Sequence, residues 1–119
     1  VEALAKAASP RIEQLMREGV TSLEIKSGYG LDVETERRQL LAAEVAASTH
    51  GFKLARTFLG AHAVPAEYKG RPDEYIDEVV LPAMDALHKE GHVDAVDAFC
   101  EGIGFTYEQT ARVFKHAAS

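Results

Sequence analysis

Apolar residues recur along this chain in two alternating patterns, one with the spacing of helices and one typical of short strands. Three runs rich in β-branched and apolar residues predict strands, at Val20–Ser27, Lys53–Gly60 and Val93–Cys100. Helical patterns lie between them, so that the strand–helix units recur roughly every 30–40 residues, the length of one βαβ step. This order predicts an α/β fold with parallel strands joined by right-handed crossovers.

Capping residues and charge mark the first two helices. Ser9 and Pro10 predict the start of the first helix, with serine as the N-cap and proline at the first helical position. Asp32 is suited to cap the second helix. Glu34 and Glu36 then fall in the first turn of that helix, where the helix dipole favours anions.

Two further helices follow the second strand. One opens near Pro72, and Pro82 lies inside its pattern, which predicts a kink or a break there. Thr106 and Gln109 form a capping box for the last helix. The residues expected to face inward are Tyr75, Ile76, Val79, Val80, Ala83 and Leu87 from the third helix, with Val113 and Phe114 from the last.

Polar residues inside the strands discriminate between two ways of closing such a sheet. The strand–helix order fits either a small doubly wound sheet or a three-strand arc of a (β/α)8 barrel. Parallel strands buried on both faces are nearly continuous in valine, isoleucine and leucine, because neither face meets water. Here every strand is interrupted by polar or charged residues: Glu24, Lys26, Arg56, Thr57, Asp94, Asp97 and Glu101. The upper interior of a barrel pairs or hydrates such groups, so the pattern favours the barrel arc.

Composition narrows the class of protein. The 119 residues are 46% hydrophobic and 27% charged, which is typical of a globular chain with at most one domain. The net charge of −6 and the scattered 13 lysines and arginines argue against nucleic-acid binding. No run is long enough to span a membrane, no signal peptide is visible, and the single Cys100 cannot form an internal disulfide, so a reducing cytosol is expected. Because the chain begins at Val1 in a helical pattern, we expect it to be a piece of a longer protein.

Each predicted strand ends in a short glycine-containing loop. The three loops are Ser27–Gly30, Leu59–His62 and Cys100–Gly104. In parallel α/β folds, the carboxyl ends of the strands meet at one edge, and substrates bind there. The three loops therefore predict one wall of an active site.

Tyr29 and His62 are the main candidates for contact with a ligand. His62 follows a strand after two small residues, whereas the other four histidines lie at predicted helix ends, where the dipole accounts for them. Tyr29 lies between two glycines and could donate to a substrate carboxylate or carbonyl. The alternatives are a loop histidine bonded to backbone and a turn tyrosine packed on a helix. No HxH or HxxxH pair accompanies His62, so the residues themselves give no support for a metal site.

Glu101 and Cys100 are weaker candidates. Glu101 could be an acid, a base or a supporting group, but a pair with Lys26 on a neighbouring strand would explain it equally well. Strand alternation places Cys100 on the opposite face from Glu101. We expect Cys100 to be a buried structural thiol rather than a nucleophile, because nothing nearby in the sequence would lower its pKa.

Long stretches of the chain resemble the imidazolonepropionases of the metal-dependent amidohydrolase superfamily. The resemblance runs from about Leu4 onward with the same order and spacing. It rests on Gly19–Asp32, Thr57–Ala63 with Pro65 and Glu67–Tyr68, Tyr75–Asp77, and Val96–Phe105.

This resemblance implies a fold and an activity. Residues 1–119 would be a fragment of the barrel domain, about strands two to four of a (β/α)8 barrel, with the small β-domain and the other strands absent. The family hydrolyses the ring C–N amide bond of 4-imidazolone-5-propanoate to N-formimidoyl-L-glutamate in histidine degradation, in the cytoplasm. Its zinc or iron ion activates the attacking water. A homodimer is conceivable for the full-length enzyme, and neither nucleic acid nor membrane is an expected partner.

The resemblance also implies roles for single residues. Tyr29 would hold the propionate end of the substrate, His62 would hydrogen-bond the imidazolone and help to polarise its carbonyl, and Glu101 would support the site wall. The family's metal ligands lie outside this chain, so no catalytic set is complete here and the isolated chain should be inactive. Two alternatives stay open: a segment of another amidohydrolase or deaminase, and a small non-catalytic α/β binding module.

Overall fold

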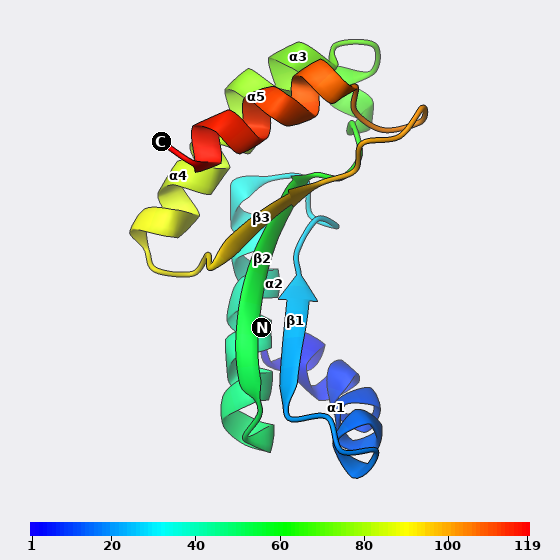
Figure 1. Cartoon of the computed structure of the whole chain (residues 1–119), viewed down its shortest axis with the longest axis vertical. Coiled ribbons are helices and arrows are strands. Elements are labelled where there is room, and N and C mark those ends of the chain that lie inside the picture. Colours follow the sequence, from blue (N-terminus) through cyan, green and yellow to red (C-terminus); the bar gives the residue numbers. More distant parts are fainter.

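Strands and helices alternate as the sequence predicts, in a computed structural model that describes residues 1–119 (Figure 1). The strands are β1 (Ser22–Lys26), β2 (Lys53–Ala61) and β3 (Ala95–Ala98). The helices are α1 (Glu2–Arg17), α2 (Val33–His50), α3 (Pro72–Tyr75), α4 (Leu81–Lys89) and α5 (Tyr107–Ala117). A 3-10 turn, η1 (Ala66–Tyr68), precedes α3, and a π-helical turn, η2 (Ile76–Val80), joins α3 to α4.

The three strands form one parallel sheet in the order β1-β2-β3. Lys26 of β1 lies beside Thr57 of β2, and Phe58 of β2 lies beside Val96 of β3. The pairing of β2 with β3 shifts between Phe58 and Ala61. The predicted α/β class with parallel strands is thus confirmed, whereas closure of these strands into a larger barrel stays a prediction.

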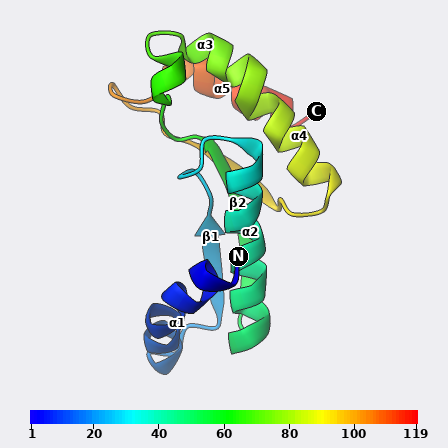
Figure 2. The same ribbon diagram turned by 180° about the vertical axis from the view of Figure 1, so that it is seen from behind.

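The two faces of the sheet differ in what covers them. Helices α1 and α2 lie on the same side of β1 and β2, as the view from behind shows (Figure 2). On the other face, the Thr57 hydroxyl donates to Glu24 (2.6 Å) and the Lys26 ammonium donates to Asp97 (2.6 Å). This cluster of Glu24, Lys26, Thr57 and Asp97, the polar face, joins all three strands. Pairing lowers the cost of holding these charges against a sheet.

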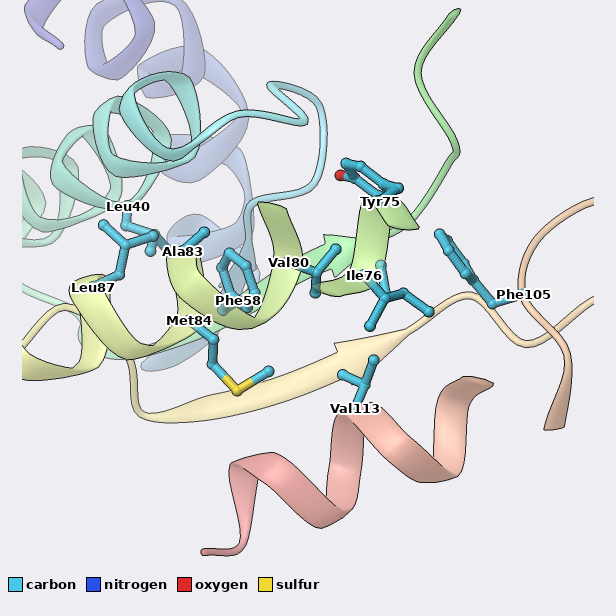
Figure 3. Packing of buried hydrophobic residues seen from close by; sticks show 11 residues of the cluster. Leu40, Phe58, Tyr75, Ile76, Val80, Ala83, Met84, Leu87, Phe105 and Val113 are labelled. Carbon is cyan, nitrogen blue, oxygen red and sulfur yellow. The ribbon is translucent and has the colours of Figure 1, made fainter. Parts of the chain in front are cut away.

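Apolar packing forms two separate clusters. The larger one lies where β2 and β3 meet the helices from α3 to α5, and Figure 3 shows its side chains converging between α4, β3 and α5. The smaller one, with Ala5, Ile12, Ala46 and Phe52 at its centre, holds α1 against α2 and the sheet. None of the helices combines the length and apolar composition needed to cross a membrane.

Helix α1 differs from its prediction. It begins at Glu2 and continues through Pro10, so the predicted start at Ser9 and Pro10 is wrong. A proline in this position cannot donate a backbone hydrogen bond to Lys6. Burial of Ala5 and Ile12 against α2 outweighs that loss, and Ser9 donates its hydroxyl to the Ala5 carbonyl instead of capping a helix.

The caps and irregularities of the helices farther along the chain are mostly as predicted. The Leu81 N–H donates to the Ile76 carbonyl five residues back, so the irregularity expected at Pro82 is present as η2. The capping box at Thr106 is also confirmed. Phe114, in contrast, was expected to face inward but is 42% exposed, so that part of the prediction is wrong.

Candidate active site

Side chains from all three strand exits meet at the carboxyl edge of the sheet. The ring of Tyr29, after β1, lies edge-on to the ring of His62, after β2, with centroids 5.0 Å apart. His62 in turn lies edge-on to Phe99, which follows β3, at 6.0 Å. The structure therefore brings together Tyr29 and His62, as the strand-exit argument predicts, and adds Phe99 from the exit of the third strand. Edge-to-face packing of this kind favours one orientation of each ring.

Tyr29 presents its side chain to the surroundings. It is 80% exposed, and its phenol group makes no hydrogen bond within the chain. Its backbone N–H instead reaches the Gln39 side chain of α2 at 3.4 Å. The phenol is therefore available to donate a hydrogen bond to an external acceptor.

His62 is held by one of its two ring nitrogens. Nδ1 lies 2.7 Å from the carbonyl oxygen of Gly28, while Nε2 makes no hydrogen bond. A carbonyl oxygen can only accept, so Nδ1 carries a proton and donates it to this bond. His62 thereby links the exit of β2 to the exit of β1 and leaves Nε2 free for a ligand.

The Gly28–Leu31 turn, which carries Tyr29, is built around the carboxylate of Glu36. Backbone N–H groups of Gly28, Gly30 and Leu31 donate to this carboxylate at 2.7, 2.9 and 3.0 Å. Glu36 is fully buried in the first turn of α2. Three charge-assisted hydrogen bonds replace the hydration that the carboxylate loses on burial.

Backbone geometry explains why glycine occurs in this turn. Gly28 has φ 109°, and a Cβ there would lie 2.6 Å from the Leu59 carbonyl oxygen. Leu31 adopts φ 59°, the left-handed region that costs a residue with a side chain roughly 1 kcal/mol or more. The hydrogen bonds to Glu36 hold both residues in these conformations.

The exit of β2 is fixed by two hydroxyl groups. Ser27 accepts from the Leu59 N–H at 3.2 Å, and Tyr75 donates its hydroxyl to the Gly60 carbonyl at 2.8 Å. Burial raises the pKa of Tyr75, with a further contribution from the nearby Glu36 carboxylate. Tyr75 therefore stays protonated and remains a donor to the carbonyl of Gly60, which lies two residues before His62.

Below these loops, the polar face carries paired charges. The hydrogen bond from Lys26 lowers the pKa of Asp97, and the same bond raises the pKa of Lys26. Both groups are consequently charged near neutral pH. Since Lys26 pairs with Asp97 at 2.6 Å and lies 3.8 Å from Glu24, the suggested pair of Lys26 with Glu101 is wrong.

Glu101 and Cys100 lie outside the cluster of Tyr29 and His62. Strand β3 ends at Ala98, so strand alternation does not extend to these positions, and the chain bends into an exposed loop. The Glu101 carboxylate is exposed and makes no hydrogen bond. Cys100 is exposed as well, so the expectation of a buried thiol is wrong.

The donor groups of this chain do not make a metal centre. No three histidine, cysteine, aspartate or glutamate side chains come together in a group that could hold a metal ion. The buried Glu36 carboxylate already accepts three hydrogen bonds from backbone N–H groups. The chain alone therefore does not fit a bound zinc or iron.

The roles of two residues of this site, Glu36 and Phe99, were not predicted from the sequence. Glu36 was assigned only to the helix dipole, and Phe99 was given no role. A glutamate in the first helical turn after a glycine-rich loop is a usable signal for such a contact. Glycine-rich loops present several backbone N–H groups at once, and a carboxylate can accept hydrogen bonds from them. Nothing local in the sequence marks Phe99.

Known proteins support the resemblance drawn from the motifs. The chain is 56% identical over 118 residues to the imidazolonepropionase of Ruegeria sp. (strain TM1040), covering 99% of the chain and 29% of that protein. It is 59% identical over 111 residues to the imidazolonepropionase of Cupriavidus metallidurans, covering 93% of the chain and 27% of the relative. The Ralstonia nicotianae imidazolonepropionase is 56% identical over 116 residues, covering 98% of the chain and 28% of the relative.

No family model matches the chain. The chain spans less than a third of the length of the curated relatives it matches, and the match extends over nearly all of its own residues. Over nearly all of its length, this chain is therefore similar to one internal stretch of these imidazolonepropionases.

Proposed function

We propose that the protein containing this chain is an imidazolonepropionase, which hydrolyses the ring C–N amide bond of 4-imidazolone-5-propanoate to N-formimidoyl-L-glutamate. The observation that carries the proposal is the identity of more than half of the aligned residues over 93–99% of the chain. The meeting of Tyr29 and His62 at the strand exits supports it, because these two side chains lie within the matched stretch.

The substrate offers two features that these side chains suit. Its propionate carboxylate is an acceptor, and the free phenol of Tyr29 is a donor. Its imidazolone ring carries N–H and carbonyl groups, and the free Nε2 of His62 can bond to that ring. Glu101 is proposed as a support of the site wall through its loop.

The architecture of the whole protein belongs to this proposal. The sheet would be an arc of a (β/α)8 barrel, about strands two to four, and residues 1–119 would be part of the barrel domain. The polar face, with its paired Lys26 and Asp97, would then line the interior of the barrel. A zinc or iron ion held by residues outside this chain would supply an activated water. The full-length enzyme would act in the cytoplasm as a homodimer.

The test is hydrolysis of 4-imidazolone-5-propanoate by the full-length protein, monitored through the decrease in the ultraviolet absorption of the substrate. Tyr29→Phe should raise KM about tenfold, since it removes one hydrogen bond to a charged group. His62→Ala should lower kcat by about 10²-fold or more, which is the usual contribution of a hydrogen-bonding or proton-transferring group at the reacting centre. Metal content, measured by elemental analysis, should be unchanged in both variants.

Matched controls are available within the chain. Tyr107→Phe and His88→Ala change exposed residues that make no side-chain hydrogen bond, and both should leave kcat and KM unchanged. Turnover of a different ring substrate in place of imidazolonepropionate would contradict the proposed substrate. Loss of metal in His62→Ala would show that His62 is a metal ligand and contradict its assignment.

A further inference from the structure

The residue that organises both candidate site loops is Glu36, which is itself buried. Four successive backbone N–H groups, from Gly28 to Leu31, all donate to side chains of α2. Three of them reach Glu36 and one reaches Gln39. The helix therefore holds the whole turn that carries Tyr29.

Glu36 has no cation as a partner. It is 1% exposed and forms no salt bridge. A buried carboxylate without a cation is costly unless hydrogen bonds compensate for its desolvation. Here the compensation comes only from the turn, so a displaced turn would leave the charge unsatisfied. The turn and the carboxylate thus fix each other.

The effect of Glu36 extends to His62 through one peptide unit. The N–H of Gly28 donates to Glu36, and the carbonyl of the same residue accepts from His62 Nδ1. Fixing Gly28 fixes the acceptor for Nδ1. In the neutral ring, the proton is then on Nδ1 and Nε2 is an acceptor, suited to a ring N–H; in the protonated ring, Nε2 is a donor, suited to a carbonyl.

We propose that Glu36 is a positioning residue of the active site, which holds the Gly28–Leu31 turn in place and thereby sets the position of Tyr29 and the orientation and tautomer of His62. The inference rests on the proposed function for its kinetic consequences, but the tautomer of His62 is independent of it. Positioning matters because a displacement of about 1 Å at a reacting group can cost on the order of 10²-fold in rate.

Two substitutions in the full-length protein separate this role from general stability. In Glu36→Gln, the amide oxygen can still accept from Gly30 and Leu31, but its NH2 group faces the Gly28 N–H and cannot accept from it. The variant should therefore disturb Gly28 and His62 most. Glu36→Ala removes all three bonds. We expect kcat/KM to fall about tenfold in Glu36→Gln and about 10²-fold in Glu36→Ala.

Glu34→Gln is the matched control, since Glu34 lies in the same helical turn but is exposed and pairs with Arg37 and Arg38. It should leave kcat/KM unchanged. Nitrogen-15 NMR of histidine-labelled protein supplies the readout that a purely structural role would not move. The His62 signals are assigned by their loss in His62→Gln. In the wild type, the neutral ring should be protonated at Nδ1, and in Glu36→Gln a mixture of tautomers should appear.

The outcomes are distinguishable. An Nε2-protonated neutral ring in the wild type would overturn the proposal, even if no Glu36 variant folds. A folded Glu36→Gln with wild-type tautomer and wild-type kcat/KM would also overturn it. If the wild type shows the expected tautomer but does not hydrolyse imidazolonepropionate, the proposed function fails while the linkage from Glu36 to His62 stands.

Discussion

Single side chains from the following helices hold the backbone at the exits of β1 and β2. Glu36 holds the turn after β1, and Tyr75 holds the carbonyl of Gly60 before His62. Both are buried and form hydrogen bonds to peptide groups rather than to other side chains. A loop fixed in this way keeps its outward side chains free for a ligand while its own polar groups are satisfied.

Close packing at Gly60 gives a prediction at the residue scale. A methyl group at this position would overlap with the ring of Phe58, which is fully buried and cannot swing away. Gly60→Ala should therefore lower the free energy of unfolding of the full-length protein by about 1–3 kcal/mol, the usual cost of overpacking. Chemical denaturation would measure it.

Gly102→Ala provides the comparison, because a methyl group at Gly102 would meet open space. Its free energy of unfolding should match the wild type within about 0.5 kcal/mol. Equal stability of Gly60→Ala and Gly102→Ala would contradict the packing described around Phe58.

At the scale of elements, one arginine joins a strand, a helix and a loop. Arg56 of β2 binds Asp94 through two nitrogens at 2.8 and 2.7 Å, Glu44 of α2 at 2.5 Å and the Gly91 carbonyl at 2.7 Å. The guanidinium geometry permits these several bonds at once. Arg56 thus fixes the start of β3 relative to α2.

The Arg56–Asp94 pair predicts a dependence of stability on pH. Hydrogen bonds from Arg56 lower the pKa of Asp94 from 3.8 to about 2. A carboxyl group with a lowered folded-state pKa stabilises the fold above its unfolded pKa, and this contribution disappears as the pH falls through the folded value. Asp94→Asn should therefore be less stable than the wild type at pH 7, and the difference should shrink between about pH 4 and pH 2.

Thermal unfolding of full-length wild type and Asp94→Asn at a series of pH values would measure this difference. Because Asp94 is partly exposed, the effect should be small and should weaken in high salt. Glu13→Gln, which removes an exposed pair with Arg17, should show no such convergence. A constant difference between wild type and Asp94→Asn across the range would contradict the assigned role of the pair.

Local signals in the sequence predicted the elements well, and long-range contacts account for the failures. Asp32 and Thr106 cap their helices as expected because a cap needs only the next three residues. The helix through Pro10 could not be predicted, since α1 is stabilised by burial against α2, more than 30 residues away. The role of Arg56 depends in the same way on Asp94, 38 residues away. The role of Glu36 depends on nearer N–H groups, which converge only when the preceding turn takes its folded shape.

At the scale of the whole molecule, the chain is extended rather than closely rounded. Its radius of gyration is 14.9 Å, with extents of 43 × 28 × 23 Å. A compact domain of this length has a radius of gyration of about 13.5 Å. The outer edges of β1 and β3 have no strand beside them, and only 24 of the 119 residues are buried. Such edges and a small core favour association with further strands.

The isolated 119-residue chain should therefore self-associate. Large apolar side chains are exposed at Leu4, Ile103 and Phe114, and Ile103 is 93% exposed. Open strand edges and exposed apolar groups together promote intermolecular pairing. Size-exclusion chromatography with light scattering should give masses above the 12.9 kDa monomer, while circular dichroism reports the helix content. A monomer that unfolds cooperatively would instead support a self-contained α/β binding module.

The order of the strands in the sheet, β1-β2-β3, is also the order in which a ribosome makes them. Each new strand pairs with the one completed just before it, after about thirty to forty residues of elongation. Assembly of this region during translation thus needs no rearrangement of strands already paired. It does leave the most recent strand with an open edge until the next one emerges, so slow elongation after β2 or β3 would prolong the interval in which that edge can pair with another nascent chain.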